Sequence, residues 1–190
     1  YGGRQFKIQD MERGQIMIEA AAIVGCKMGE AYCRFHGWCG LVQDDEKAFS
    51  IFKGIAEETG SAYAENMLGI CYEEGNGVTQ DMAKAIECYA KAAEKGHSDA
   101  MNLLGMCYFD GLGVNQNMTK AFEWYLLAAE KGHSGAMYNL AMLYYHGIGV
   151  AVDLTKAIKW FRNSAEKGVC AAVNGLGMLY FNGIGMLEDL

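Results

Sequence analysis

The sequence has no excess of basic residues. Its 190 residues include 16 Lys and Arg against 23 Asp and Glu, which gives a formal net charge of −7. Nucleic-acid binding needs a basic footprint for the phosphates, and an anionic membrane surface attracts basic segments for the same reason. The charge balance therefore argues against nucleic acid and against a membrane surface as partners.

Long apolar runs are also missing. No stretch approaches the roughly 20 apolar residues that a membrane-spanning helix needs, so we expect no direct membrane insertion. With 52% hydrophobic and 21% charged residues, the composition is that of a globular protein with ample material for a core. The sequence begins at Tyr1 rather than at Met, so we expect a fragment or a processed product. Both a cytoplasmic and a secreted or periplasmic location stay open.

Recognisable catalytic and metal-binding motifs are absent from the sequence. None of the four histidines pairs with another at metal spacing, and there is no H-E-x-x-H. Glycine pairs such as Gly111 and Gly113 lack the third glycine and the Lys-Ser/Thr of a phosphate loop. No nucleophile–base or paired-carboxylate constellation stands out. We therefore expect no enzyme, no metal and no cofactor, and we interpret His97 and His133, which share one repeat position, as structural.

The sequence does contain a repeat of 36 residues. Residues 64–99 and 100–135 are identical at about 22 of 36 positions, and residues 136–171 follow the pattern more loosely. Residues 172–190 begin a further copy, and residues 1–63 hold degenerate units. We predict one repeat domain over 1–190, with three complete units and a partial C-terminal one.

Each unit has the pattern of a helix, a glycine turn, a second helix and another glycine turn. The first helix carries Ala100, Leu104, Cys107 and Tyr108 at helical spacing. One unit alone cannot bury both of its apolar faces, so we expect the units to stack into an all-α solenoid of antiparallel helix pairs. Gly105 lies inside a helix, where we expect a neighbouring helix to approach closely.

Polar residues at fixed repeat positions predict where the helices begin. The second helices have Asn or Asp as N-cap candidates, and the first helices have Ser. These candidates are Asp81, Asn117, Asp153, Ser98 and Ser134.

These residues resemble the Sel-1-like repeat, a relative of the tetratricopeptide repeat. The resemblance rests on A-x-x-x-L-G-x-x-Y at Ala100–Tyr108, G-x-G-V at Gly111–Val114, K-A at Lys120–Ala121 and A-A-E-K-G at Ala128–Gly132. The tetratricopeptide repeat fits less well, because its period is 34 residues and its usual closing proline is absent from a chain without Pro. The resemblance implies a right-handed superhelix and adaptor roles, in complexes at membranes or in bacterial signalling and host contact, rather than catalysis.

Seven cysteines leave at least one free or paired outside the chain. Cys71 and Cys107 fall where other units carry Leu, so we interpret them as core residues. Cys26, Cys33 and Cys39 crowd into the poorest-fitting unit. A cysteine-rich subgroup of the Sel-1-like proteins carries one disulfide per repeat, between cysteines about eight residues apart. The resemblance thus implies a Cys26–Cys33 pair, but the better repeats lack such a pair. A disulfide, simple packing and a metal site stay open.

A stripe on the first helix of each unit is the candidate binding face. Counted from the leading Ala of a unit, positions 3, 7, 10 and 11 lie three or four residues apart, away from the packing positions 1, 5, 8 and 9. By analogy with tetratricopeptide repeats, we expect the stripe to line a concave groove for a protein or peptide. The predicted contact residues are Asn66, Ile70, Glu73, Asn102, Met106, Phe109, Tyr138, Met142, Tyr145, His146, Asn174, Met178 and Phe181.

The residue types of the stripe fit a peptide ligand. Asn amides can pair with a peptide backbone, and Met and aromatic side chains give adaptable apolar contacts. The stripe has no Lys or Arg, which argues against a clamp for a C-terminal carboxylate. The alternative is that its Met and aromatic side chains pack against neighbouring helices.

We therefore predict a non-enzymatic adaptor with a protein or peptide partner. Resemblance to the cysteine-rich subgroup suggests an alternative, a secreted or periplasmic protein that binds cell-wall or β-lactam-like ligands. A third alternative is a structural segment of a longer repeat array. Self-association could occur through the partial repeat at 172–190.

Overall fold

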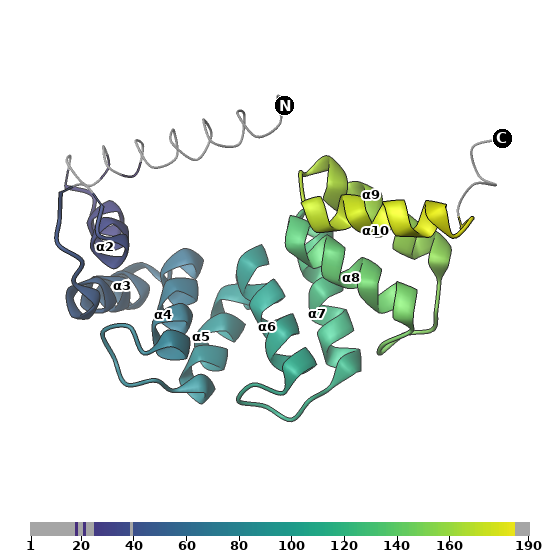
Figure 1. The fold of residues 1–190 in the computed structure, drawn as a ribbon. Helices are drawn as coiled ribbons and strands as arrows, with labels where there is room; N and C mark the ends of the chain where they lie inside the picture. The colour runs from purple at the N-terminus through teal and green to yellow at the C-terminus, as the bar shows by residue number, and fades with distance from the viewer. Residues whose placement is uncertain (1–17, 19–20, 22–24, 39, 185–190) are drawn as a thin grey trace. The chain divides into compact units, whose positions relative to one another are not determined.

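The computed structural model describes residues 25–38 and 40–184 together with Ile18 and Ala21. All regular structure in this part is helical, and consecutive helices form antiparallel pairs (Figure 1). The all-α prediction is therefore confirmed for the described residues. The helices are α2 (Lys27–His36), α3 (Asp45–Thr59), α4 (Ala62–Glu74), α5 (Met82–Glu94), α6 (Ser98–Asp110), α7 (Met118–Glu130), α8 (Ser134–His146), α9 (Leu154–Glu166) and α10 (Cys170–Phe181). No helix among them is long and apolar enough to cross a bilayer.

The second helices begin at the predicted caps. The Asn117 side chain accepts a hydrogen bond from the Lys120 N–H at 3.0 Å, and Asp153 accepts one from Lys156 at 2.9 Å. The Asp81 carboxylate does the same for Lys84 at 3.1 Å. Each bond satisfies one of the free N–H groups of a helix start, so these three predictions are confirmed.

The first helices begin differently from the prediction. His97 Nδ1 accepts from the Ala100 N–H at 3.4 Å, and His133 Nδ1 accepts from the Ala136 N–H at 2.9 Å. Ser98 is the first residue of its helix rather than the cap, and Ser134 of α8 is placed in the same way. The serine prediction is wrong because the residue one position earlier already supplies an acceptor, the unprotonated imidazole nitrogen. The structural interpretation of both histidines is confirmed.

Gly105 lies where α6 meets α7. A Cβ atom at this position would lie 2.6 Å from Cδ1 of Tyr125. The prediction of a close helix approach is therefore confirmed, and the tyrosine ring fills the space that a side chain would need.

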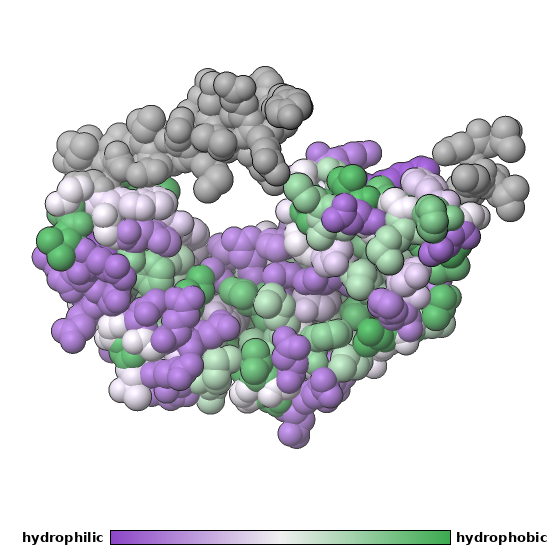
Figure 2. All heavy atoms as spheres, viewed as in Figure 1, coloured by the Kyte–Doolittle hydropathy of each residue, from purple (hydrophilic) through white to green (hydrophobic). Residues whose placement is uncertain are grey.

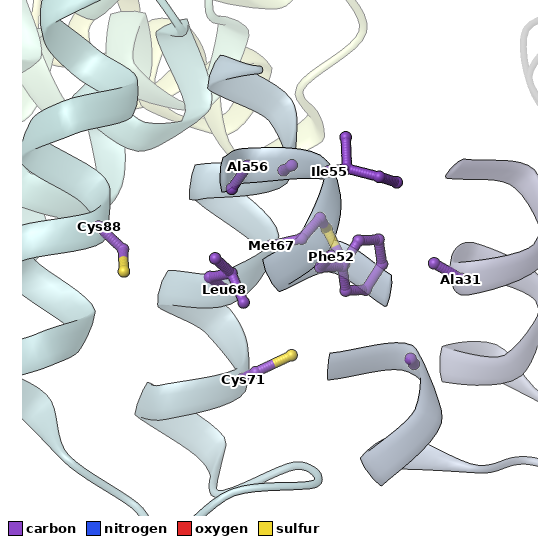
Figure 3. Close-up of a cluster of buried hydrophobic side chains, with 10 residues drawn as sticks. Ala31, Phe52, Ile55, Ala56, Met67, Leu68, Cys71 and Cys88 are labelled. Atoms are coloured by element: carbon purple, nitrogen blue, oxygen red, sulfur yellow. The ribbon is translucent and has the colours of Figure 1, made fainter. Parts of the chain in front are cut away.

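The chain divides into two compact units, residues 1–92 and residues 93–190. In the first unit, Phe52 and Ile55 of α3 pack with Met67, Leu68 and Cys71 of α4 (Figure 3). Figure 3 labels Met67 and Phe52 among the side chains of this cluster. All five residues are buried.

The core of the second unit repeats one pattern over several helices. Leu104 and Cys107 of α6 are buried, as are Leu140 and Leu143 of α8. The aromatic residue of each second helix joins them, with Tyr125 at 3% and Phe161 at 2% exposure. Packing positions 1, 5 and 8 are thus inside the stack, whereas Tyr108 at position 9 is only half-buried.

The described cysteines correct the proposed pairing. Cys71 and Cys107 are buried, as expected for core residues. Cys33 is disulfide-bonded and buried, whereas Cys26 is free and exposed, so the Cys26–Cys33 pair is wrong. Cys26 is the N-cap of α2 and Cys33 lies two turns further along, about 10 Å away at 1.5 Å per residue. A disulfide needs Cα atoms about 4.4–6.8 Å apart.

Cys39 and the metal-site alternative complete the hypotheses about the cysteines. Cys39 lies outside the described residues, and Cys71, Cys88 and Cys170 are free. The described residues contain no group of His, Cys, Asp or Glu that could hold a metal ion.

Candidate partner-binding site

Predicted contact residues of α6 and α8 meet in one pocket of the second unit. Met106 and Phe109 of α6 and Met142 and His146 of α8 line a cavity of about 270 Å³. Tyr125 of α7 lies at the same cavity, although it was not predicted there. The other lining residues are Asp110, Asn139, Leu143 and Ile148. The structure thus brings together four residues from two repeats that the stripe predicted.

The apolar side chains of this pocket are only partly used in packing. Met106 is 40% exposed, and Phe109 and Met142 are half-buried. Leu112 and Leu127 are other large exposed apolar residues of this unit. Figure 2 shows hydrophobic surface between hydrophilic side chains in the second unit. An accessible apolar cavity is the arrangement that a binding surface needs.

Two predicted residues of α8 do not line the pocket. The Tyr138 ring lies 5.8 Å from the Phe161 ring of α9, measured between centroids, so it packs between helices. The Tyr145 ring lies 4.7 Å from the imidazole of His146 in an edge-on contact. For Tyr138, the alternative interpretation as a packing residue is the better description.

Two asparagines connect α6 to α8. Asn139 Nδ2 donates to Asn102 Oδ1 at 3.3 Å, and Asn102 Nδ2 donates to the Met106 sulfur at 3.6 Å. The predicted residue Asn102 is therefore occupied within the protein, and it holds Met106 beside the pocket. Asn139, which lines the pocket itself, was missed because the corresponding residues Leu103 and Gly175 give no polar pattern.

Tyr125 was also missed, since the repeat assigns it to the core. Burial raises the pKa of its hydroxyl well above the usual value, and the nearby carboxylate of Asp110 raises it further. The corresponding Tyr89 donates its hydroxyl hydrogen to Glu73 of α4. The second unit has Phe109 at the position of Glu73, and a phenylalanine side chain cannot accept a hydrogen bond from the tyrosine hydroxyl. The change from Glu to Phe at this position, with the tyrosine kept, is the sequence signal that could have identified Tyr125.

The stripe of the first unit is less accessible than predicted. Asn66 is only 4% exposed, and its Oδ1 has no hydrogen-bond partner among the described residues. A buried amide cannot meet a ligand, so Asn66 is not a surface contact in this structure. Ile70 and Glu73 are half-buried, and Glu73 accepts the bond from Tyr89.

The stripe of α10 is exposed. Met178 is 64% exposed and Phe181 is 91% exposed, and Asn174 is exposed as well. These side chains are far more open than Met106 and Phe109, their counterparts on α6.

A comparison with protein families matches most of the chain. The Sel1 repeat model matches residues 18–53, 62–97, 98–133, 134–169 and 170–190. Its first match lies in the region that the sequence shows as degenerate. Among curated proteins, DAP3-binding cell death enhancer 1 of Rattus norvegicus is 40% identical over 50 residues, which is 26% of this chain. The chain matches only 10% of the length of that relative.

Solved structures share the fold. A Sel1 repeat protein from Oxalobacter formigenes is 32% identical with a TM-score of 0.79, over 84% of this chain and 64% of that one. A protective antigen of uropathogenic Escherichia coli with an SLR fold is 33% identical with a TM-score of 0.79, over 90% of this chain and 37% of that one. The cysteine-rich protein B of Helicobacter pylori is 22% identical over 70% of this chain and 94% of that one. Its TM-score of 0.55 shows a shared fold alone. These likenesses confirm the predicted class of α/α repeat solenoid.

Proposed function

The chain belongs to the Sel1 repeat family, whose members generally mediate protein–protein interactions, and on that premise we propose that it is a non-enzymatic adaptor that binds a protein or peptide between α6 and α8. The observation that carries this proposal is the accessible pocket that Met106, Phe109 and Met142 line. Methionine and aromatic side chains adapt to varied apolar ligands, which suits a surface that must accept a peptide.

The charges around the pocket limit the partner. Among the described residues, the lining has Asp110 and His146 as its ionisable side chains apart from Tyr125, and it has no Lys or Arg. A partner that presents carboxylates there would meet no cation and would approach Asp110. The surface therefore favours a partner segment that is apolar at its centre and neutral or basic beside it.

The other candidate functions have less support. The cell-wall or β-lactam-like alternative followed from resemblance to the cysteine-rich subgroup, and a Cys26–Cys33 pair would have favoured it. Cys33 is disulfide-bonded, but Cys26 is free, so that pair gives it no support. A purely structural role in a longer array would leave the pocket without a ligand. The variant described next separates that role from an adaptor.

The test is a double substitution in the pocket, Phe109→Glu with Met142→Glu. We expect this variant to lose its partner in an affinity capture from the cells that make the protein, because two carboxylates replace the apolar wall. The matched control is Leu112→Glu with Val152→Glu, which adds the same charge at positions that are 45% and 59% exposed and do not line the pocket. The control should capture the partner as the unmodified chain does.

Circular dichroism decides whether a loss of binding is meaningful. Both double variants should keep the helical signal of the unmodified chain. A loss of helicity in the pocket variant would show that Phe109 and Met142 are core residues. Retained capture by the pocket variant would contradict the proposal equally.

A further inference from the structure

The Tyr125 hydroxyl makes no hydrogen bond to a described residue, although the side chain is only 3% exposed and its ring packs against Gly105. Among the described residues, the fully buried side-chain polar atom without a hydrogen bond is Asn66 Oδ1, so the Tyr125 oxygen still reaches solvent. Tyr125 lines the pocket, and its hydroxyl is therefore a donor that a ligand in the pocket can use.

The neighbouring repeats show what packing alone requires. In the first unit, the corresponding Tyr89 donates to Glu73, so its hydroxyl is satisfied inside the protein. In the third complete repeat the position is Phe161, which has no hydroxyl and is equally buried, at 2% exposure. A phenylalanine thus fills this site adequately. Only in the repeat of Tyr125 does a hydroxyl stand beside an apolar replacement for Glu73, namely Phe109.

The Tyr125 hydroxyl acts as a donor. Burial raises its pKa first and the charge of Asp110 second, so the hydroxyl stays protonated at neutral pH. The influence of Asp110 also places a carboxylate near the phenol, and both residues line the same cavity. An anionic acceptor would be repelled there, so the acceptor that completes the site must be neutral.

Asn139 provides the pocket with a hydrogen-bond acceptor, whereas Tyr125 provides a donor. Asn139 uses its Nδ2 to bond Asn102, so its Oδ1 remains as an acceptor for a ligand N–H. A neutral ligand with one carbonyl acceptor and one N–H donor is a peptide group. The surrounding walls are apolar, from Met106, Phe109 and Met142.

The size of the pocket sets how much of a ligand it can hold. Its volume of about 270 Å³ lies below the ~300–1,000 Å³ that is typical of sites for small molecules and cofactors. One side chain with its adjoining peptide group needs less room than a cofactor does.

We propose that this pocket is an anchor subsite that holds one apolar side chain of a partner peptide, with the adjoining peptide carbonyl accepting a hydrogen bond from Tyr125. The inference rests on the proposed function and adds to it the chemistry of the segment that is recognised. The subsite binds an apolar residue that has an intact peptide group on each side. The charge of Asp110 disfavours a free carboxylate of the ligand in the same place.

The direct test uses N-acetyl-L-leucine methylamide, a leucine side chain between two peptide groups. The protein carries 12 methionines, and labelling their methyl carbons with ¹³C makes Met106 and Met142 reporters in the pocket. We expect their signals to shift in a saturable way, while that of Met178 on α10 does not move. N-acetylglycine methylamide, which lacks the side chain, should cause no such shift. Unmoved Met106 and Met142 signals at high ligand concentration would overturn the subsite.

The hydroxyl is tested with Tyr125→Phe, which keeps the ring against Gly105. The Kd of the leucine probe should rise about fivefold, as expected for one neutral hydrogen bond. Tyr89→Phe is the matched control, and it should leave the Kd unchanged. An unchanged Kd in Tyr125→Phe would show that the hydroxyl makes no bond to the ligand.

Chemical denaturation gives a readout that does not depend on a ligand. Tyr125→Phe removes an unpaired hydroxyl, so its unfolding midpoint should equal or exceed that of the unmodified chain. Tyr89→Phe removes a paired one, so its midpoint should fall. A larger fall for Tyr125→Phe would mean that this hydroxyl has a partner inside the protein, and the inference would be wrong. Partner capture that depends on Phe109 and Met142 but not on Tyr125 would refute the anchor chemistry and leave the proposed function intact.

Discussion

Histidine caps two of the first helices, and its cap depends on protonation. His133 Nδ1 accepts from the Ala136 N–H at 2.9 Å, which only the unprotonated nitrogen can do. Burial lowers the pKa of His133, and Asp99, whose Oδ1 lies 3.5 Å from Nε2, opposes this only in part. A proton on Nδ1 would remove the cap and put a positive charge at the positive end of the helix dipole.

The sign of the resulting pH dependence follows from the lowered pKa. The unfolded chain binds the proton more readily than the folded chain, so the contribution of His133 is fully present above the unfolded pKa of about 6.5. It is lost as the pH falls through the folded pKa. Urea unfolding should show that the free energy of unfolding of the unmodified chain falls between pH 7.5 and pH 5. The fall should be smaller in His133→Asn, because an Asn side chain caps the helix without titrating. The difference should be on the order of 1 kcal/mol, the usual value of a cap. Equal falls in both proteins would contradict this account of the cap.

At the scale of elements, the loop inside a hairpin also touches the preceding repeat. Gly149 has a φ of 70°, and a Cβ atom there would collide with the backbone carbonyl of Met118 at the start of α7. Gly77 holds the same relation to Asp45 at the start of α3. The second glycine of the loop is therefore needed for two reasons: its backbone is left-handed, and it contacts the backbone of the preceding repeat.

Gly149→Ala should accordingly lower the free energy of unfolding by more than the strain of the left-handed backbone alone. The left-handed conformation costs an alanine roughly 1–2 kcal/mol, and the clash with the Met118 carbonyl adds to that. Gly54→Ala is the control, since it lies inside α3 with nothing within 4 Å of a new Cβ, and it should stabilise by about 0.5–1 kcal/mol. Denaturant unfolding of both variants checks the pair. A cost for Gly149→Ala below about 1 kcal/mol would show that the loop adapts.

The sequence predicts those elements that repeat. The 36-residue period and the helical spacing give the helix pairs, the buried positions and the Asn and Asp caps, because each depends on residues near one another in the chain. The histidine caps were missed because serine follows at the next position and is the commoner cap. Tyr125 was missed because its role depends on Phe109, a residue of another helix that the repeat pattern treats separately. The burial of Asn66 depends on the residues that cover it, and position in a repeat does not give that.

At the scale of the molecule, each compact unit has its own core, and their surfaces differ. The stripe of the first unit is partly consumed by internal bonds, such as that of Glu73 with Tyr89. The stripe of the second unit opens into an apolar pocket that Tyr125 also lines, and the Tyr125 hydroxyl makes no hydrogen bond to a described residue. A repeat protein can therefore confine recognition to one pair of repeats, while the other repeats serve as scaffold. We propose that the partner binds at α6 and α8.

Site-specific photo-crosslinking shows where on the protein the partner is bound. A benzophenone amino acid in place of Met142 should crosslink a partner in the cells that make the protein. The same residue in place of Val152, which is 59% exposed and does not line the pocket, should crosslink little. We expect a partner band at position 142 that disappears when Phe109→Glu is added. A band of equal strength at position 152, or a band at position 142 that survives Phe109→Glu, would contradict the proposal.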